Sequence, residues 1–189
     1  MKISSTFIKD LFLIEPSIIK DKRGYFMESY RDDIFNSRFP HLNFCQENES
    51  KSKYGVLRGL HYQLPPYAQT KLVRVISGKV LDVAVDIRQG SETFGNYFSV
   101  ELSGNNKKQL LIPRGFAHGF VVLSKEAIFS YKVDSYYNKG CDRGIIYNDK
   151  SLKIDWKLAN TDLNISTKDI KLPELKDAEY FNYFHNLYE

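Results

Sequence analysis

Apolar and polar residues alternate over most of the middle of this chain, from about residue 42 to residue 147. The clearest case runs from Lys79 to Arg88, where every second residue from Leu81 to Ile87 is apolar and would share one face of a strand. Similar short apolar runs lie at residues 55–63, 71–76, 97–102, 109–112, 118–123 and 128–133. Many short strands separated by turn residues, with no helix-length amphipathic run between them, predict an all-β sandwich or barrel rather than a parallel α/β sheet.

The flanks of this strand-rich region differ from it. Residues Asp32 to Phe39 predict a short helix, with Asp32 or Asp33 available as its cap. After Trp156 the chain becomes polar, and it ends in an aromatic cluster that favours burial. We therefore expect one domain over residues 1–189, with short flanking helices and a C-terminal extension, about residues 157–189, that packs on the barrel as a helical lid or brace.

The length and the composition narrow the class of protein. A chain of 189 residues and 22.0 kDa suits one domain. Two cysteines are too few for a zinc module built on three or four thiolates, or for two disulfides. No segment has the 18 apolar residues of a membrane helix, and the first residues do not resemble a signal peptide. We expect Cys45 and Cys141 to be free thiols in a cytoplasmic protein.

The charge is mildly positive and spread along the chain. The formal net charge is +4, and no block of five like charges occurs. Such a surplus fits either a solvated lysine-rich surface or the binding of a small phosphorylated substrate. Because the chain has no basic stripe and no recognition-helix pattern, we expect no nucleic-acid partner.

Two histidines fall in segments that resemble the halves of the cupin signature. His118 ends the P-x-G-x-x-H spacing that begins at Pro113, and His61 lies in the segment Arg58–Gln63. A metal cupin needs a second histidine in the first half, where this chain has glutamine at Gln63. Because a stable metal site takes three or four good ligands, we predict no metal. A hydrogen-bonded core histidine remains an alternative reading of His118.

Arg58 and His61 have opposite parity on their predicted strand, so a regular strand would send them to opposite faces. A bulge at Gly59 would bring both to one site. Tyr131 alternates with apolar residues, which is typical of a core residue as well as of a catalytic one. Lys71 shares its parity with the valines that follow it, and a lysine that enters the barrel needs an acidic partner or an anionic ligand.

A series of motifs follows the chain in order with near-constant spacing, namely Asp21–Glu28, Gln46–Asn48, Val56–Gln63, Lys71–Arg74, Asp82–Arg88, Ser91–Gly95, Ile112–Phe120, Tyr131-Lys132, Tyr136-Tyr137, Asn148-Asp149 and Ile154–Trp156. Together they resemble the dTDP-4-dehydrorhamnose 3,5-epimerase family of the cupins. The resemblance runs from about residue 5 to residue 170.

The resemblance implies a cupin jelly roll, a homodimer and no metal or organic cofactor. It also implies that dTDP-4-dehydro-6-deoxy-D-glucose is epimerised at C3 and C5. His61 matches the general base, Asp169 the carboxylate that orients it, Tyr131 the general acid, and Lys71 and His118 residues near the sugar. Further matches to substrate-binding residues are Arg23, Glu28, Gln46, Asn48, Arg58, Tyr137, Asp142 and Lys168.

The implied chemistry suits these residue types. The hydrogens on C3 and C5 are both next to the C4 ketone, so removal of either leaves an enolate. The reaction needs a base on one face of the ring, an acid on the other, and a cation such as Lys71 at the oxygen. A single-site epimerase, a metal-dependent cupin oxygenase and a non-catalytic sugar-binding cupin stay open as alternatives. The sequence also leaves open the nucleotide, the 4-keto sugar and the final deoxysugar.

Overall fold

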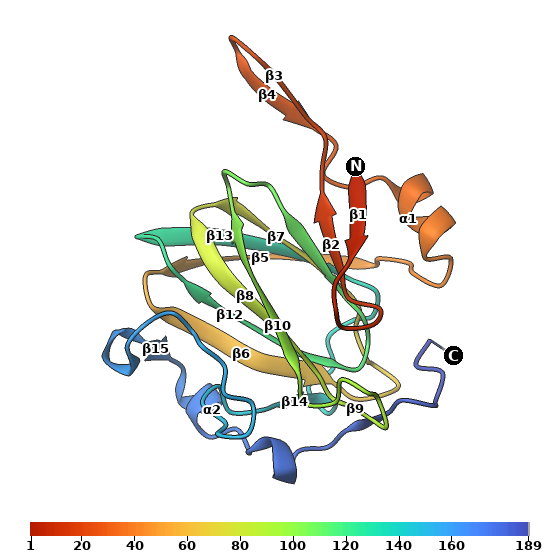
Figure 1. Cartoon of the computed structure of the whole chain (residues 1–189), viewed down its shortest axis with the longest axis vertical. Coiled ribbons are helices and arrows are strands. Elements are labelled where there is room, and N and C mark those ends of the chain that lie inside the picture. Colours follow the sequence, from red (N-terminus) through yellow and green to blue (C-terminus); the bar gives the residue numbers. More distant parts are fainter. Residues whose placement is uncertain (189) are drawn as a thin grey trace.

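The computed structural model describes residues 1–188 and shows two β-sheets packed face to face as a jelly roll (Figure 1). The first sheet has the spatial order β1 (Lys2–Ser5), β2 (Phe12–Glu15), β11 (Gln109–Ile112), β7 (Lys71–Ser77), β13 (Glu126–Val133) and β5 (Gln46–Lys53). The second has the order β10 (Tyr97–Ser103), β8 (Lys79–Asp86), β12 (Phe116–Val122), β6 (Val56–Gln63) and β14 (Asp142–Gly144). The predicted all-β jelly roll is confirmed.

Strand β8 shows how the alternating pattern builds two cores. Val80 and Ala84 point into the space between the sheets, where they belong to the interior cluster. Leu81, Val83 and Val85 point the other way, yet they are buried too, because the C-terminal part of the chain covers the outer face of the second sheet. From Val80 onward, strand β8 therefore has only apolar side chains on one face and both polar and apolar ones on the other, but both faces are buried.

Helix α1 (Asp32–Arg38) packs on the outer face of the first sheet, against residues of β2, β7 and β11. Its Phe35 is fully buried in a cluster with Ile14 and Leu72. The predicted aspartate cap is wrong: Arg31 occupies the cap position with no side-chain bond. Asp32 and Asp33 lie inside the first turn, where negative charge favours the positive end of the helix dipole.

The hairpin of β3 (Ile18–Asp21) and β4 (Gly24–Met27) projects away from the barrel (Figure 1). Ile19 and Phe26 pair across it, and each is about two-thirds exposed, at 67% and 65%. Apolar side chains this exposed on a projecting element are typical of an interaction surface.

The C-terminal part of the chain is mostly extended, whereas the sequence predicted a helical lid or brace. Its helical turns are α2 (Thr167–Ile170), η1 (Asn160–Asp162) and η2 (Leu175–Asp177), and short strands β15 (Asn164–Ile165) and β16 (Phe181–Asn182) pair in parallel with β6 and β9 (Arg88–Gln89). Trp156, Leu175 and Phe181 are each buried in the apolar cluster on the outer face of the second sheet. Because these contacts are made by single residues far apart in the sequence, the segment packs on the barrel without forming a long amphipathic helix. Glu189, the last residue of the predicted C-terminal extension, lies outside the described residues.

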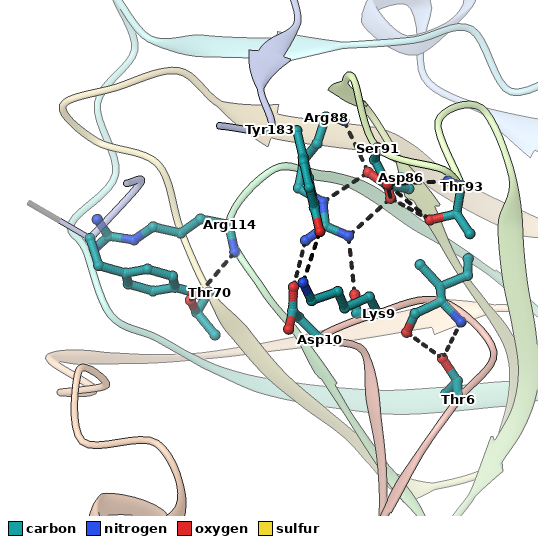
Figure 2. Close-up of polar contacts among 12 residues, drawn as sticks. Thr6, Lys9, Asp10, Thr70, Asp86, Arg88, Ser91, Thr93, Arg114 and Tyr183 are labelled. Atoms are coloured by element: carbon teal, nitrogen blue, oxygen red, sulfur yellow. Dashed lines mark hydrogen bonds and ion pairs between the residues drawn. The ribbon is translucent and has the colours of Figure 1, made fainter. Parts of the chain in front are cut away.

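An ion-pair network fixes the chain just after β8. The buried Arg88 guanidinium contacts Asp86 and Asp10, each at 2.9 Å, and the ring of Tyr183 lies over it (Figure 2). Cys45 and Cys141 are free thiols, as predicted. None of the helices in residues 1–188 has the length and apolar content to cross a membrane.

Candidate active site

A cavity of about 500 Å³ is bounded by strands of both sheets and by the segment around α2. Seven of its lining residues were candidates from the sequence, and their side chains come from five elements. They are Arg58 and His61 on β6, Lys71 on β7, His118 on β12, Tyr131 on β13, and Lys168 and Asp169 on α2. Residues more than 100 positions apart in the sequence thus meet in one hollow.

His61 and Asp169 form a hydrogen-bonded pair at the cavity wall. Nε2 of His61 lies 2.8 Å from Oδ1 of Asp169, whose side chain is only 5% exposed. The Ser166 hydroxyl caps α2 by accepting from the Asp169 N–H, which fixes the backbone beneath the carboxylate. Burial raises the pKa of Asp169, but the hydrogen bond and charge of His61 outweigh it. The pKa therefore lies below its ordinary value, and the group stays ionised.

The predicted bulge in β6 is present and brings Arg58 and His61 to one side. His118 pairs with His61 and Phe120 with Arg58, so two steps along β12 match three steps along β6. Gly59 allows this with a φ of +127°, and a Cβ added there would lie 2.5 Å from the Cα of Gly119. Only glycine fits this close approach.

Lys71 enters the barrel together with the valines that follow it, as its parity predicted. Its Nζ donates to the backbone carbonyl of His61 at 3.3 Å, and the residue is 9% exposed. Burial lowers the pKa of this ammonium to about 8, although the charges of Asp142 and Asp82 favour the protonated form. For Lys71, burial therefore outweighs the charges of the two carboxylates.

His118 is both a cavity residue and a hydrogen-bonded core residue, so the two readings of it are compatible. Its Nε2 lies 2.9 Å from Oδ2 of Asp82, which is fully buried. The other oxygen, Oδ1, is buried without a hydrogen-bond partner within the described part of the chain. The sequence reasoning missed Asp82, although a carboxylate on the inward parity of β8 signals a buried polar partner.

Tyr131 lines the cavity from the first sheet, whereas His61 lines it from the second. Burial raises the pKa of its phenol above the ordinary value, against the charge of Arg58 and a hydrogen bond with Asn48. Asn48 is the cross-strand neighbour of Tyr131, and its amide oxygen accepts from Gln46 at 2.8 Å. Gln46 and Asn48 therefore support the phenol from β5.

Tyr137, Asp142 and Lys168 form a polar cluster beside the cavity. The Asp142 carboxylate accepts from Lys168 Nζ at 2.6 Å and from the Tyr137 hydroxyl at 3.2 Å. The hydrogen bond that Lys168 donates to Asp142 raises the pKa of Lys168, so its ammonium stays charged. Tyr137 is 59% exposed, so its side chain offers aromatic surface to a flat ligand.

Arg23 and Glu28 are not brought to this cavity. Arg23 lies in the turn of the β3–β4 hairpin and pairs with Asp21 at 2.6 Å, and Glu28 lies just past it, 3.5 Å from Arg31. The sequence also did not single out Phe120 and Phe129, whose stacked rings line the cavity. Among residues 1–188, no group of three or more His, Cys, Asp or Glu side chains is placed to hold a metal ion.

Comparisons with known proteins point to one family. The family model described as dTDP-4-dehydrorhamnose 3,5-epimerase matches residues 5–177. A relative of that name from Shigella flexneri is 52% identical over 182 residues, which is 96% of this chain and 99% of the relative. The crystal structure of such an enzyme from Elizabethkingia anophelis has 51% identity and a TM-score of 0.90, covering 95% of this chain and 99% of its own.

A further solved structure carries a ligand. The crystal structure of dTDP-6-deoxy-D-glucose-3,5-epimerase from Legionella pneumophila, in complex with dTDP-4-keto-L-rhamnose, is 45% identical to this chain. Its TM-score is 0.93, and the match covers 97% of this chain and 99% of that one.

Proposed function

The chain belongs to the dTDP-4-dehydrorhamnose 3,5-epimerase family, and we propose how its cavity performs the reaction of that family. The enzyme is an isomerase of dTDP-rhamnose synthesis. It converts dTDP-4-dehydro-6-deoxy-D-glucose to dTDP-4-dehydro-L-rhamnose. The observation that carries the assignment of roles is that His61, paired with Asp169, and the partly buried Tyr131 line one cavity from opposite sheets.

His61 is the proposed base. Because a carboxylate only accepts, the Nε2–H of His61 donates to Asp169, and the lone pair on Nδ1 is left to take a proton. The ionised Asp169 then stabilises the imidazolium that forms. Removing the hydrogen from C3 or C5, each next to the C4 ketone, gives an enolate whose charge lies on the C4 oxygen.

Tyr131 is the proposed acid. Its raised pKa keeps the phenol protonated near neutral pH, so that it can return a proton to the ring face opposite His61. Protonation from the opposite face inverts the carbon. The same pair serves C3 and C5, because both carbons adjoin one ketone.

Lys71 and His118 are the proposed partners of the enolate oxygen and the sugar. A buried ammonium acts strongly on a nearby anion because little water screens it. Arg58 and Lys168 at the cavity suit the diphosphate, and the exposed ring of Tyr137 suits the thymine. Protons alone move in these steps, so the chemistry calls for no redox partner.

Arg23 and Glu28 are proposed to act in a homodimer. They lie on or next to the projecting hairpin and away from the cavity of their own chain, as described above. Insertion of the hairpin into a second copy would cover Ile19 and Phe26 and bring Arg23 near the partner's substrate.

The test is turnover of the purified enzyme on dTDP-4-dehydro-6-deoxy-D-glucose, with the product drawn off by a coupled 4-ketoreductase. We expect turnover by the wild type and its near-complete loss in His61→Asn, which removes the base at similar volume. Product inverted at a single carbon would favour the single-site alternative. Full activity in His61→Asn would refute the assigned roles.

A further inference from the structure

Residues 181–188 cross one end of the barrel, and the reaction described above uses none of them. We call Phe181–Tyr188 the C-terminal strap. It begins with β16, which pairs in parallel with β9, and continues with a hydrogen bond from the N–H of Tyr183 to the carbonyl of Gln89. The strap lies beyond residue 177, where the family match ends.

Tyr188 closes the strap onto two residues of the barrel. Its hydroxyl lies 3.0 Å from the hydroxyl of Thr70, and it accepts the backbone N–H of Arg114 at 3.4 Å. The guanidinium of Arg114 lies over the Tyr188 ring and donates to the carbonyl of Leu187 at 2.7 Å. Burial raises the pKa of the Tyr188 phenol, so the hydroxyl keeps its proton at neutral pH.

Asp134 hydrogen-bonds to both Thr70 and Arg114. One carboxylate oxygen accepts the Thr70 N–H at 2.6 Å, and the other accepts Nε of Arg114 at 3.1 Å. The N–H of Asp134 donates in turn to the carbonyl of Thr70. Because the Asp134 side chain is only 2% exposed, water does not compete for these bonds. Thr70, Arg114, Asp134 and Tyr188 form one closed junction.

The junction lies at the ends of the strands that carry the proposed catalytic groups. Thr70 directly precedes Lys71, and Asp134 directly follows β13, three residues after Tyr131. Arg114 stands two residues before β12, on the approach to His118. His61 and Asp169 stand outside the junction, on β6 and α2. The junction therefore ties together the acid and the enolate partners, but not the base.

We propose that Tyr188 is a positioning residue: through the junction, the strap holds Lys71, Tyr131 and His118 at the spacing that the enolate requires. The inference rests on the roles proposed above for those three residues. A misplacement of about 1 Å can cost about 10²-fold in rate. Loss of one hydroxyl from the junction should cost less, about tenfold in kcat, with KM unchanged because the diphosphate contacts lie elsewhere.

The experiment compares two tyrosine-to-phenylalanine variants on the strap of the full-length enzyme. Tyr188→Phe removes the hydroxyl of the junction and keeps the ring. Tyr183→Phe is the matched control, because its hydroxyl accepts from Lys9 at 2.9 Å and its ring lies against Arg88, away from Thr70 and Arg114 (Figure 2). Thr70→Val removes the other hydroxyl, and Thr70→Ser retains it.

We expect kcat to fall in Tyr188→Phe and Thr70→Val at constant KM, and to recover in Thr70→Ser. Tyr183→Phe should match the wild type, and circular dichroism should show all four variants folded at the assay temperature. An active wild type with an equally active Tyr188→Phe overturns this inference and leaves the proposed function standing. Equal losses in Tyr183→Phe and Tyr188→Phe also overturn it. An inactive wild type overturns the proposed function and this inference with it.

Discussion

At the scale of single residues, the proposed mechanism depends on a cation that is shielded from water. Lys71 is 9% exposed, and burial lowers its pKa to about 8. In water its charge would be screened, whereas in the cavity it acts strongly on an enolate oxygen. The titratable groups that face this ammonium or line its cavity are Asp82, Asp142, Glu49, Arg58, His61, His118, Tyr131, Lys168 and Asp169.

The alkaline side of the pH profile should report Lys71. The rate needs its ammonium form, so kcat/KM should fall as pH rises through about 8. Tyr131 titrates higher, because its pKa is raised from an already high ordinary value. Lys71→Met should lower kcat about 10²–10³-fold and remove this limb. Lys168→Met, the matched control on α2, should raise KM and keep the fall in kcat/KM at alkaline pH. A limb that persists in Lys71→Met would refute the role of Lys71.

The residues of the site could be predicted unevenly from the sequence. The parity of Lys71 with the valines after it placed its side chain inside the barrel, and the glycine beside Arg58 suggested the bulge. Asp169 could be placed only by resemblance, because α2 meets β6 through tertiary packing that no local pattern encodes. Asp82 was missed because its partner His118 lies on another strand, so only the pairing of β8 with β12 reveals the contact.

At the scale of elements, the strands next to the site depart from the regular pattern. Strand β5 (Gln46–Lys53) carries no apolar residue, so alternation does not reveal it. Its inward face is polar because it borders the cavity, where Asn48 meets Tyr131. Strand β6 is bulged for a related reason, since a regular strand would send Arg58 and His61 to opposite faces. Local irregularity thus marks the functional end of the barrel.

The bulge of β6 gives a prediction about stability. Gly59→Ala should lower the free energy of unfolding by more than the ~1–3 kcal/mol of backbone strain, because the new Cβ also meets the backbone of Gly119. Gly24→Ala is the matched control: Gly24 has a φ of +139°, but its Cβ would meet nothing within 4 Å. Urea unfolding at one protein concentration measures both. Equal losses in the two variants would contradict the close approach of β6 and β12.

At the scale of the whole molecule, one protomer holds most of the predicted site. The hairpin with Arg23 stands clear of the barrel (Figure 1). It exposes Ile19 and Phe26. The sequence motif of the hairpin predicted substrate contacts. The sequence does not show whether the hairpin contacts the substrate of its own chain or that of a second copy. The shape of the molecule favours a second copy as the receiver.

The homodimer can be tested by light scattering. We expect the wild type to have twice the mass of the chain, and Phe26→Asp to shift toward monomer and to lose activity, because the charge opposes burial of the hairpin. Phe7→Asp is the matched control, since Phe7 is 66% exposed and lies outside the hairpin. A monomeric wild type with full activity would contradict the proposal that the partner completes the site.

Proton NMR of dTDP-4-dehydro-6-deoxy-D-glucose incubated with the enzyme in D2O tests the proposed proton transfers directly. We expect the signals of both the C3 and C5 hydrogens to disappear as deuterium enters at each carbon, and His61→Asn to prevent the loss of both. Tyr131→Phe should still permit exchange but slow the appearance of the inverted sugar. Deuterium at only one of the two carbons, or exchange that continues unchanged without His61, would contradict epimerisation at both carbons with His61 as the base.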